Sequence, residues 1–135
     1  MEYKDLVSRA LKAREKAYVP YSNFKVGAAI LTEDGTIYDG CNIENASLGA
    51  TNCAERTAIF KAVSEGHKNI KAVAVVGDTN AYTFPCGICR QVIAEFAQSD
   101  IPVILAKNEN DYIVKTLADI LPGAFTKKNL DESKA

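Results

Sequence analysis

The spacing of apolar residues along the chain changes from a helical repeat to a β repeat within its N-terminal third. Apolar residues recur close to the helical spacing over 5–18, which predicts a first helix. The runs 24–32 and 37–42 are typical of strands, and Asp34-Gly35 between them predicts a hairpin turn that pairs them antiparallel. The segment 70–77 is nearly all apolar, which indicates a strand buried in the middle of a sheet.

Helices and strands alternate in the second half of the chain. The further elements predicted there are a helix over 53–65, a helix over 87–97, a strand over 101–106, a short strand over 112–114 and a short helix over 116–121. Such alternation implies βαβ crossovers and parallel pairing. The sequence therefore predicts an α/β fold, a three-layer α-β-α sandwich in which helices cover both faces of a five-stranded mixed sheet. We expect one domain over 1–135, with a polar tail that frays from about residue 127.

Composition and charge narrow the class of protein. The chain has 135 residues, 47% of them hydrophobic, and its 16 basic and 17 acidic side chains nearly cancel. Scattered lysines without a basic stripe argue against a nucleic acid polymer as partner. No apolar run approaches the roughly 18 residues that a membrane helix requires, and the N-terminal residues show no signal segment. Four cysteines in such a chain indicate a reducing compartment, so we expect a cytoplasmic enzyme that acts on a small molecule.

Three cysteines carry the strongest chemical signal. Cys53, Cys86 and Cys89 can supply three thiolates to one Zn²⁺, and catalytic zinc sites keep three protein ligands and leave a position for water. All three fall at predicted helix starts, where partial positive charge favours the thiolate. Arg56 lies one helical turn after Cys53 and can donate to the sulfurs, which offsets their negative charge. Glu55 is the carboxylate that could move the protons of the zinc-bound water. We expect Cys53 at the N-cap, so that Glu55 faces the pocket from the first turn.

Other interpretations of these residues stay open at this level. The Cys86-x-x-Cys89 pair alone is compatible with a thiol–disulfide module, and Cys41 could complete a closed, non-catalytic site with four thiolates. Cys41 stands in a strand pattern, however, where a small buried apolar side chain is commoner than a ligand. His67, the only histidine, follows a helix-ending glycine among polar residues, which favours a surface position.

Five motifs in a fixed order resemble one known family. They are Phe24-Lys25-Val26-Gly27-Ala28-Ala29, Cys41-Asn42-Ile43-Glu44-Asn45-Ala46, Cys53-Ala54-Glu55-Arg56-Thr57-Ala58, Pro85-Cys86-Gly87-Ile88-Cys89-Arg90-Gln91 and Leu121-Pro122-Gly123-Ala124-Phe125. From the first helix to about Phe125 the sequence closely resembles the small, homotetrameric, zinc-dependent cytidine deaminases of pyrimidine salvage. The resemblance implies hydrolysis of cytidine or 2′-deoxycytidine to uridine or 2′-deoxyuridine and ammonia, with one Zn²⁺ per chain.

The resemblance also assigns the residues that would bind the substrate. It implies that Asn42 and Glu44 hold the ribose 3′-hydroxyl, as an amide and a carboxylate can. Phe24 would lie against the pyrimidine, Phe125 would reach in from a neighbouring subunit, and the backbone of Ala54 would contact the base.

One departure and one rival accompany the resemblance. Many members carry an aromatic residue where this chain has Ser47, Leu48 and Gly49, which affects the intersubunit part of the pocket. A blasticidin-type aminonucleoside deaminase shares Cys-x-Glu and Pro-Cys-x-x-Cys, but the pair Asn42 and Glu44 favours a plain ribose.

Overall fold

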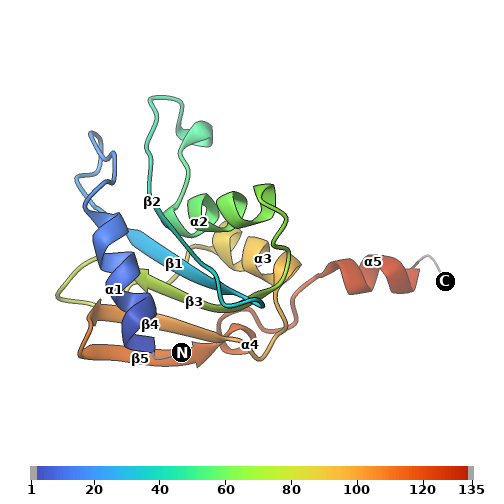
Figure 1. The fold of residues 1–135 in the computed structure, drawn as a ribbon. Coiled ribbons are helices and arrows are strands. Elements are labelled where there is room, and N and C mark those ends of the chain that lie inside the picture. The colour runs from blue at the N-terminus through green and yellow to red at the C-terminus, as the bar shows by residue number, and fades with distance from the viewer. Residues whose placement is uncertain (1–2, 134–135) are drawn as a thin grey trace.

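The fold is described from a computed structural model, which places residues 3–133 (Figure 1). Its elements are, in chain order, α1 (Tyr3–Arg14), β1 (Gly27–Thr32), β2 (Ile37–Cys41), the 3-10 helix η1 (Leu48–Ala50), α2 (Ala54–Ser64), β3 (Ile70–Val76), α3 (Gly87–Phe96), β4 (Pro102–Asn108), β5 (Asp111–Thr116), α4 (Leu117–Ile120) and α5 (Lys127–Ser133). The ends of the predicted single domain, residues 1–2 and 134–135, lie outside the described residues. No helix within residues 3–133 has the length and apolar composition needed to cross a membrane.

The five strands form one mixed sheet in the order β2-β1-β3-β4-β5. β1 pairs antiparallel with both β2 and β3, and β5 pairs antiparallel with β4. β3 and β4 pair in parallel because α3 carries the chain back between them. The predicted five-stranded mixed sheet is confirmed. Its parallel part is smaller than the alternation of elements suggested, since β3 and β4 are the one parallel neighbour pair among the described strands.

Helices cover both faces of the sheet, as predicted (Figure 1). On one face α1 buries Leu6 and Val7 against Ala74 and Ile104 of the central strands. On the other face α2 and α3 pack over a second apolar cluster, to which α3 contributes Ile93. These two cores make a three-layer sandwich. The starts of α2 and α3 lie side by side on the second face.

Two predicted boundaries are wrong by three or more residues, because backbone groups there form hydrogen bonds with a distant part of the chain. The first helix ends at Arg14 rather than residue 18, since the N–H of Tyr18 donates to the carbonyl of Asn42 at 3.0 Å. The strand predicted from Phe24 begins at Gly27. Ahead of it, the Asn42 side chain accepts from the N–H of Val26 at 2.9 Å and donates to the carbonyl of Phe24 at 2.8 Å. A side chain therefore takes the place of a ladder partner over residues 24–26.

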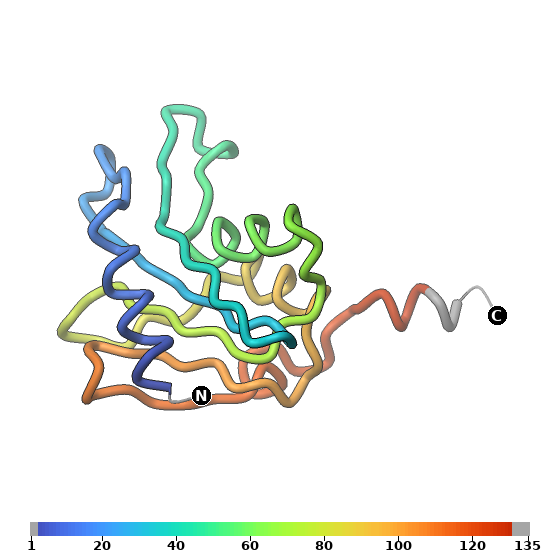
Figure 2. The backbone as a smooth tube through the Cα atoms, viewed as in Figure 1, coloured from blue at the N-terminus to red at the C-terminus, as the bar shows by residue number. Residues whose placement is uncertain are grey.

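Within the predicted polar tail, residues 127–133 form the helix α5, and its fraying stays a prediction. The side chain of Asn129 accepts from the N–H of Thr126 at 2.8 Å, and this bond caps the start of the helix. α5 extends away from the rest of the chain (Figure 2). It takes no part in the arrangement of thiols described next.

Candidate metal centre and active site

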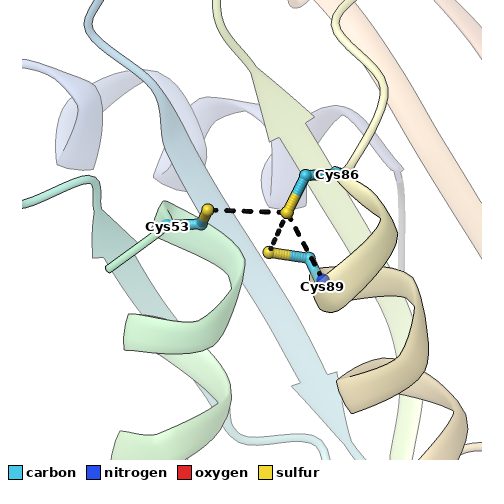
Figure 3. Close-up of side chains that lie close together, drawn as sticks. All are labelled: Cys53, Cys86 and Cys89. Carbon is cyan, nitrogen blue, oxygen red and sulfur yellow. Dashed lines mark hydrogen bonds between the residues drawn. The ribbon is translucent and has the colours of Figure 1, made fainter. Parts of the chain in front are cut away.

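Three cysteine thiols meet where α2 and α3 begin (Figure 3). Cys53 is the N-cap of α2 and Cys86 is the N-cap of α3, with extended backbone at both positions. The sulfur of Cys86 lies 3.6 Å from that of Cys53 and 3.3 Å from that of Cys89, and all three sulfurs lie within 4.8 Å of one another. The prediction that Cys53 stands outside the helix as its N-cap is confirmed.

The donor set and its spacing fit a zinc ion. Tetrahedral zinc with Zn–S bonds of about 2.3 Å separates two sulfur ligands by about 3.8 Å, close to the observed separations. The Cys41 sulfur does not belong to this group, so the protein offers three thiol ligands at this site and not four. That count leaves one position of a tetrahedron for a ligand from outside the protein, which is the catalytic pattern.

Arg56 and the neighbouring thiols favour negative charge on Cys53. Nη2 of Arg56 donates to the Cys53 sulfur at 3.2 Å. A hydrogen bond from the Cys89 thiol, and then the one from Arg56, lower the pKa of Cys53 to about 5 against the opposing effect of burial. The bond to Cys53 in turn raises the pKa of Arg56. The surroundings of Cys53 therefore favour its thiolate, which is the form that binds a metal cation.

Glu55 is a buried acid beside the thiols. Its side chain is only 3% exposed, and burial raises its pKa to about 7. The first turn of α2 that holds it is fixed against β2 at Gly40, where a Cβ atom would lie 2.6 Å from the nitrogen of Ala58 and 2.8 Å from the oxygen of Ala54. A carboxyl group with a pKa near neutrality can both accept and release a proton at working pH.

A cavity of about 270 Å³ opens onto Cys53 and Cys86. Five residues singled out in the sequence line it, namely Phe24, Asn42, Glu44, Ala54 and Glu55. A hollow of about 300 Å³ beside Glu33 and Glu95 is comparable in size, but its described lining includes no cysteine. The cavity beside Cys53 and Cys86 is therefore the candidate active site, because it adjoins possible metal ligands.

Four further residues line this cavity without having been identified from the sequence, namely Ser22, Val26, Thr83 and Phe84. Thr83 and Phe84 directly precede Pro85-Cys86, so their closeness to a predicted ligand was a usable signal. Ser22 lies in the loop that follows α1, and that loop is brought to the cavity by contacts far along the chain.

Those contacts come from Asn42 and Glu44, which also line the cavity. Besides the Asn42 bonds to residues 24–26, Glu44 accepts from the N–H groups of Tyr21 and Ser22 at 3.0 and 3.1 Å and from the Ser22 hydroxyl. Hydrogen bonding from Ser22 lowers the pKa of Glu44, which favours its carboxylate. The two side chains thus hold the loop in place and remain on the cavity surface.

The remaining residues named from the sequence lie elsewhere. Phe125 does not line the cavity; its ring is 61% exposed, and its carbonyl accepts from Nε2 of Gln91 at 2.7 Å. His67 lies 3.6 Å from Asp34 and beside the ring of Tyr38, away from the thiols. Leu48, within the segment that departs from the resembled family, is 81% exposed.

Comparison with known proteins gives a consistent result. Residues 1–105 match the family described as the cytidine and deoxycytidylate deaminase zinc-binding region. The chain is 58% identical over 130 residues to a cytidine deaminase of Sporosarcina psychrophila, covering 96% of each, and 52% identical over 132 residues to one of Halalkalibacterium halodurans, covering 98% of this chain and all of that one. The fold superposes on a crystal structure of cytidine deaminase from Burkholderia pseudomallei with a TM-score of 0.86 and 50% identity, covering 93% of this chain and 100% of the other.

Proposed function

This chain belongs to the cytidine and deoxycytidylate deaminase zinc-binding family, and from that premise we propose how its own residues carry out the reaction. The chain is a zinc-dependent enzyme that deaminates cytidine. A blasticidin-type activity is not favoured, because the similar relatives over nearly the whole chain are cytidine deaminases. We extend the substrate to 2′-deoxycytidine and the role to pyrimidine salvage.

One observation carries the proposal: a buried acid and two of the three clustered thiols, Cys53 and Cys86, line one cavity together with the polar side chains of Asn42 and Glu44. The same cavity of about 270 Å³ is therefore bordered both by metal ligands and by Asn42 and Glu44. A space of this kind suits a small ligand with a flat apolar part and a polar part. A nucleoside has both.

Cys53, Cys86 and Cys89 would hold the zinc ion, and Arg56 would offset the charge of their thiolates. When bound, zinc lowers the pKa of a water molecule towards about 7 and so supplies a nucleophile at neutral pH. Cysteine ligation makes the centre electron-rich, and the hydrogen bond from Arg56 to Cys53 withdraws part of that charge.

Glu55 is the proton carrier in this proposal. It accepts one proton from the attacking water and delivers it to N3 of the pyrimidine as oxygen bonds to C4. It then takes the remaining proton from the hydroxyl now on C4 and passes it to the amino group. The C4–N bond breaks, ammonia leaves, and the oxygen stays on C4 as the carbonyl of uridine. Burial supports this role, because it brings the pKa of Glu55 to about 7, where donation and acceptance are both accessible. Acid–base help of this kind contributes about 10²–10⁴-fold.

Asn42 and Glu44 would bind the ribose 3′-hydroxyl at the opposite end. Their loop contacts leave unused capacity, since Nδ2 of Asn42 has a second hydrogen and Oε2 of Glu44, which accepts from the Ser22 hydroxyl, has a second lone pair. Phe24 would lie along the base, and the backbone of Ala54 would contact it beside Glu55.

Phe125 would complete a neighbouring subunit's pocket in a homotetramer. Its ring is largely exposed on this chain, as a residue given to a neighbour would be. Sedimentation velocity of the intact protein tests the assembly, and a monomer at assay concentration would contradict it.

The test of the proton carrier is the loss of cytidine absorbance and the release of ammonia for the parent and for Glu55→Gln. We expect Glu55→Gln to bind one zinc per chain and to lose at least about 10²-fold in kcat, because the amide cannot accept and pass on the proton. Glu65→Gln, at the opposite end of the same helix, is the matched control and should turn over like the parent. Equal rates for Glu55→Gln and the parent would refute the assignment.

A further inference from the structure

The cavity has a second aromatic wall that is not among the residues predicted from sequence. Phe84 lines it together with Thr83, in the segment between the end of β3 and the ligand Cys86. Phe84 is 44% exposed, almost the same as the 43% of Phe24, which lines the same cavity. An aromatic ring that is this open and borders a cavity offers its face or edge to whatever enters.

Arg90 holds the segment that carries this ring. Its guanidinium lies 5.9 Å from the centroid of the Phe84 ring, within cation–π range. Nε of Arg90 donates to the carbonyl of Pro85 at 2.8 Å, and Nη1 donates to the carbonyl of Ile120 at 2.7 Å. Two backbone bonds therefore fix the guanidinium, and the guanidinium faces the ring. Phe84 is a positioned wall rather than a free surface side chain.

The chemistry of deamination decides which edge of the base meets this wall. Glu55 must reach N3, so N3 faces the start of α2, where Glu55 and Ala54 lie. C5 lies on the other side of C4 from N3, so it faces away from α2. Besides the start of α2, the segment ahead of α3 lines the cavity through Thr83 and Phe84, next to the ligand Cys86.

We propose that Phe84 bounds the pocket at the C5 edge of the pyrimidine and thereby sets which 5-substituted cytidines the enzyme accepts. This inference rests on the proposed function. The ring also adds apolar contact to the base, so its removal weakens the binding of cytidine. A pocket wall discriminates about 10–200-fold per methylene-sized group, so a single methyl at C5 is a sufficient probe.

The test compares kcat/KM for 5-methylcytidine and for cytidine in the parent, Phe84→Ala and Phe84→Leu. We expect the ratio of 5-methylcytidine to cytidine to rise about tenfold or more in Phe84→Ala and by less in Phe84→Leu, while KM for cytidine rises in both. Tyr3→Ala is the matched control: it removes an aromatic side chain that packs edge-to-face against Tyr112 and lies outside this cavity, and its ratio should equal that of the parent.

A binding measurement tests the role of Phe84 independently of the catalytic step. In the Glu55→Gln background, the ratio of the calorimetric Kd for cytidine to that for 5-methylcytidine should rise on Phe84→Ala, in the same direction as the kcat/KM ratio. An unchanged ratio in both assays, with one zinc per chain, would overturn the role of Phe84. If Phe84→Ala loses zinc or folds poorly, Phe84→Leu decides in the same way. Failure of the proposed function looks different, because the parent itself would then leave cytidine unchanged, or Glu55→Gln would match it.

Discussion

Removal of Arg56 should reduce activity while the fold survives. In Arg56→Ala the Cys53 sulfur loses the hydrogen bond that it accepts from Nη2 at 3.2 Å. A hydrogen bond to a charged group contributes about 1.5–3 kcal/mol. If that amount is lost from the transition state, at about 1.36 kcal/mol per tenfold, kcat/KM falls by about 10–150-fold. Arg56 is only partly buried on the surface of α2, so we expect folding to be retained.

The assay is steady-state deamination of cytidine, run alongside zinc content per chain and circular dichroism. Lys61→Ala is the matched control on the same helix. Lys61 pairs with Asp39 at 3.3 Å, both side chains are partly exposed, and pairs of that kind contribute about 0–1 kcal/mol. The reasoning is refuted if Arg56→Ala carries one zinc per chain and matches the parent in kcat/KM. Loss of zinc together with activity would place the effect of Arg56 on metal affinity, and a competition titration with a chelator measures that share.

Two other substitutions test the geometry of the site. Gly77→Ala should raise KM for cytidine about fivefold or more with zinc retained, because its Cβ would lie 2.4 Å from Oγ1 of Thr83 and 3.0 Å from Cζ of Phe24, and relieving such overpacking costs about 1–3 kcal/mol; a parental KM would show that these two cavity residues can shift freely. Cys41→Ser should keep one zinc per chain, since Cys41 lies outside the group of three sulfurs; metal loss measured by atomic absorption would point to a fourth thiolate.

The order and type of the main helices and strands follow from local periodicity, and so they could be predicted. Strand 70–77 and the helices after Cys53 and before Ala97 are set by runs of apolar residues that need no distant partner to be recognised. The errors occur where a distant group takes over a backbone bond. Asn42 determines both the end of α1 and the late start of β1, and neither effect is visible in the local sequence.

The residues of the candidate site also divide into those that the local sequence reveals and those whose position depends on distant contacts. Cys53, Cys86 and Glu55 were identifiable because their chemistry is unusual and their spacing places them at two helix starts. Ser22 and Phe84 were not identified, because their place in the cavity depends on the paths of two loops that are fixed by Glu44 and Arg90. For Phe84, the local sequence offers one signal, its position two residues before the predicted ligand Cys86.

X-ray absorption at the zinc edge tests the central claim most directly. For the intact protein loaded with one zinc per chain, we predict three sulfur neighbours at about 2.3 Å and one lighter neighbour, oxygen or nitrogen, at about 2.0–2.2 Å. The lighter neighbour should persist in Glu55→Gln, because Glu55 is not proposed as a ligand. A first shell of four sulfurs, or a lighter neighbour that disappears in Glu55→Gln, would contradict a three-thiolate centre that leaves its fourth position to solvent.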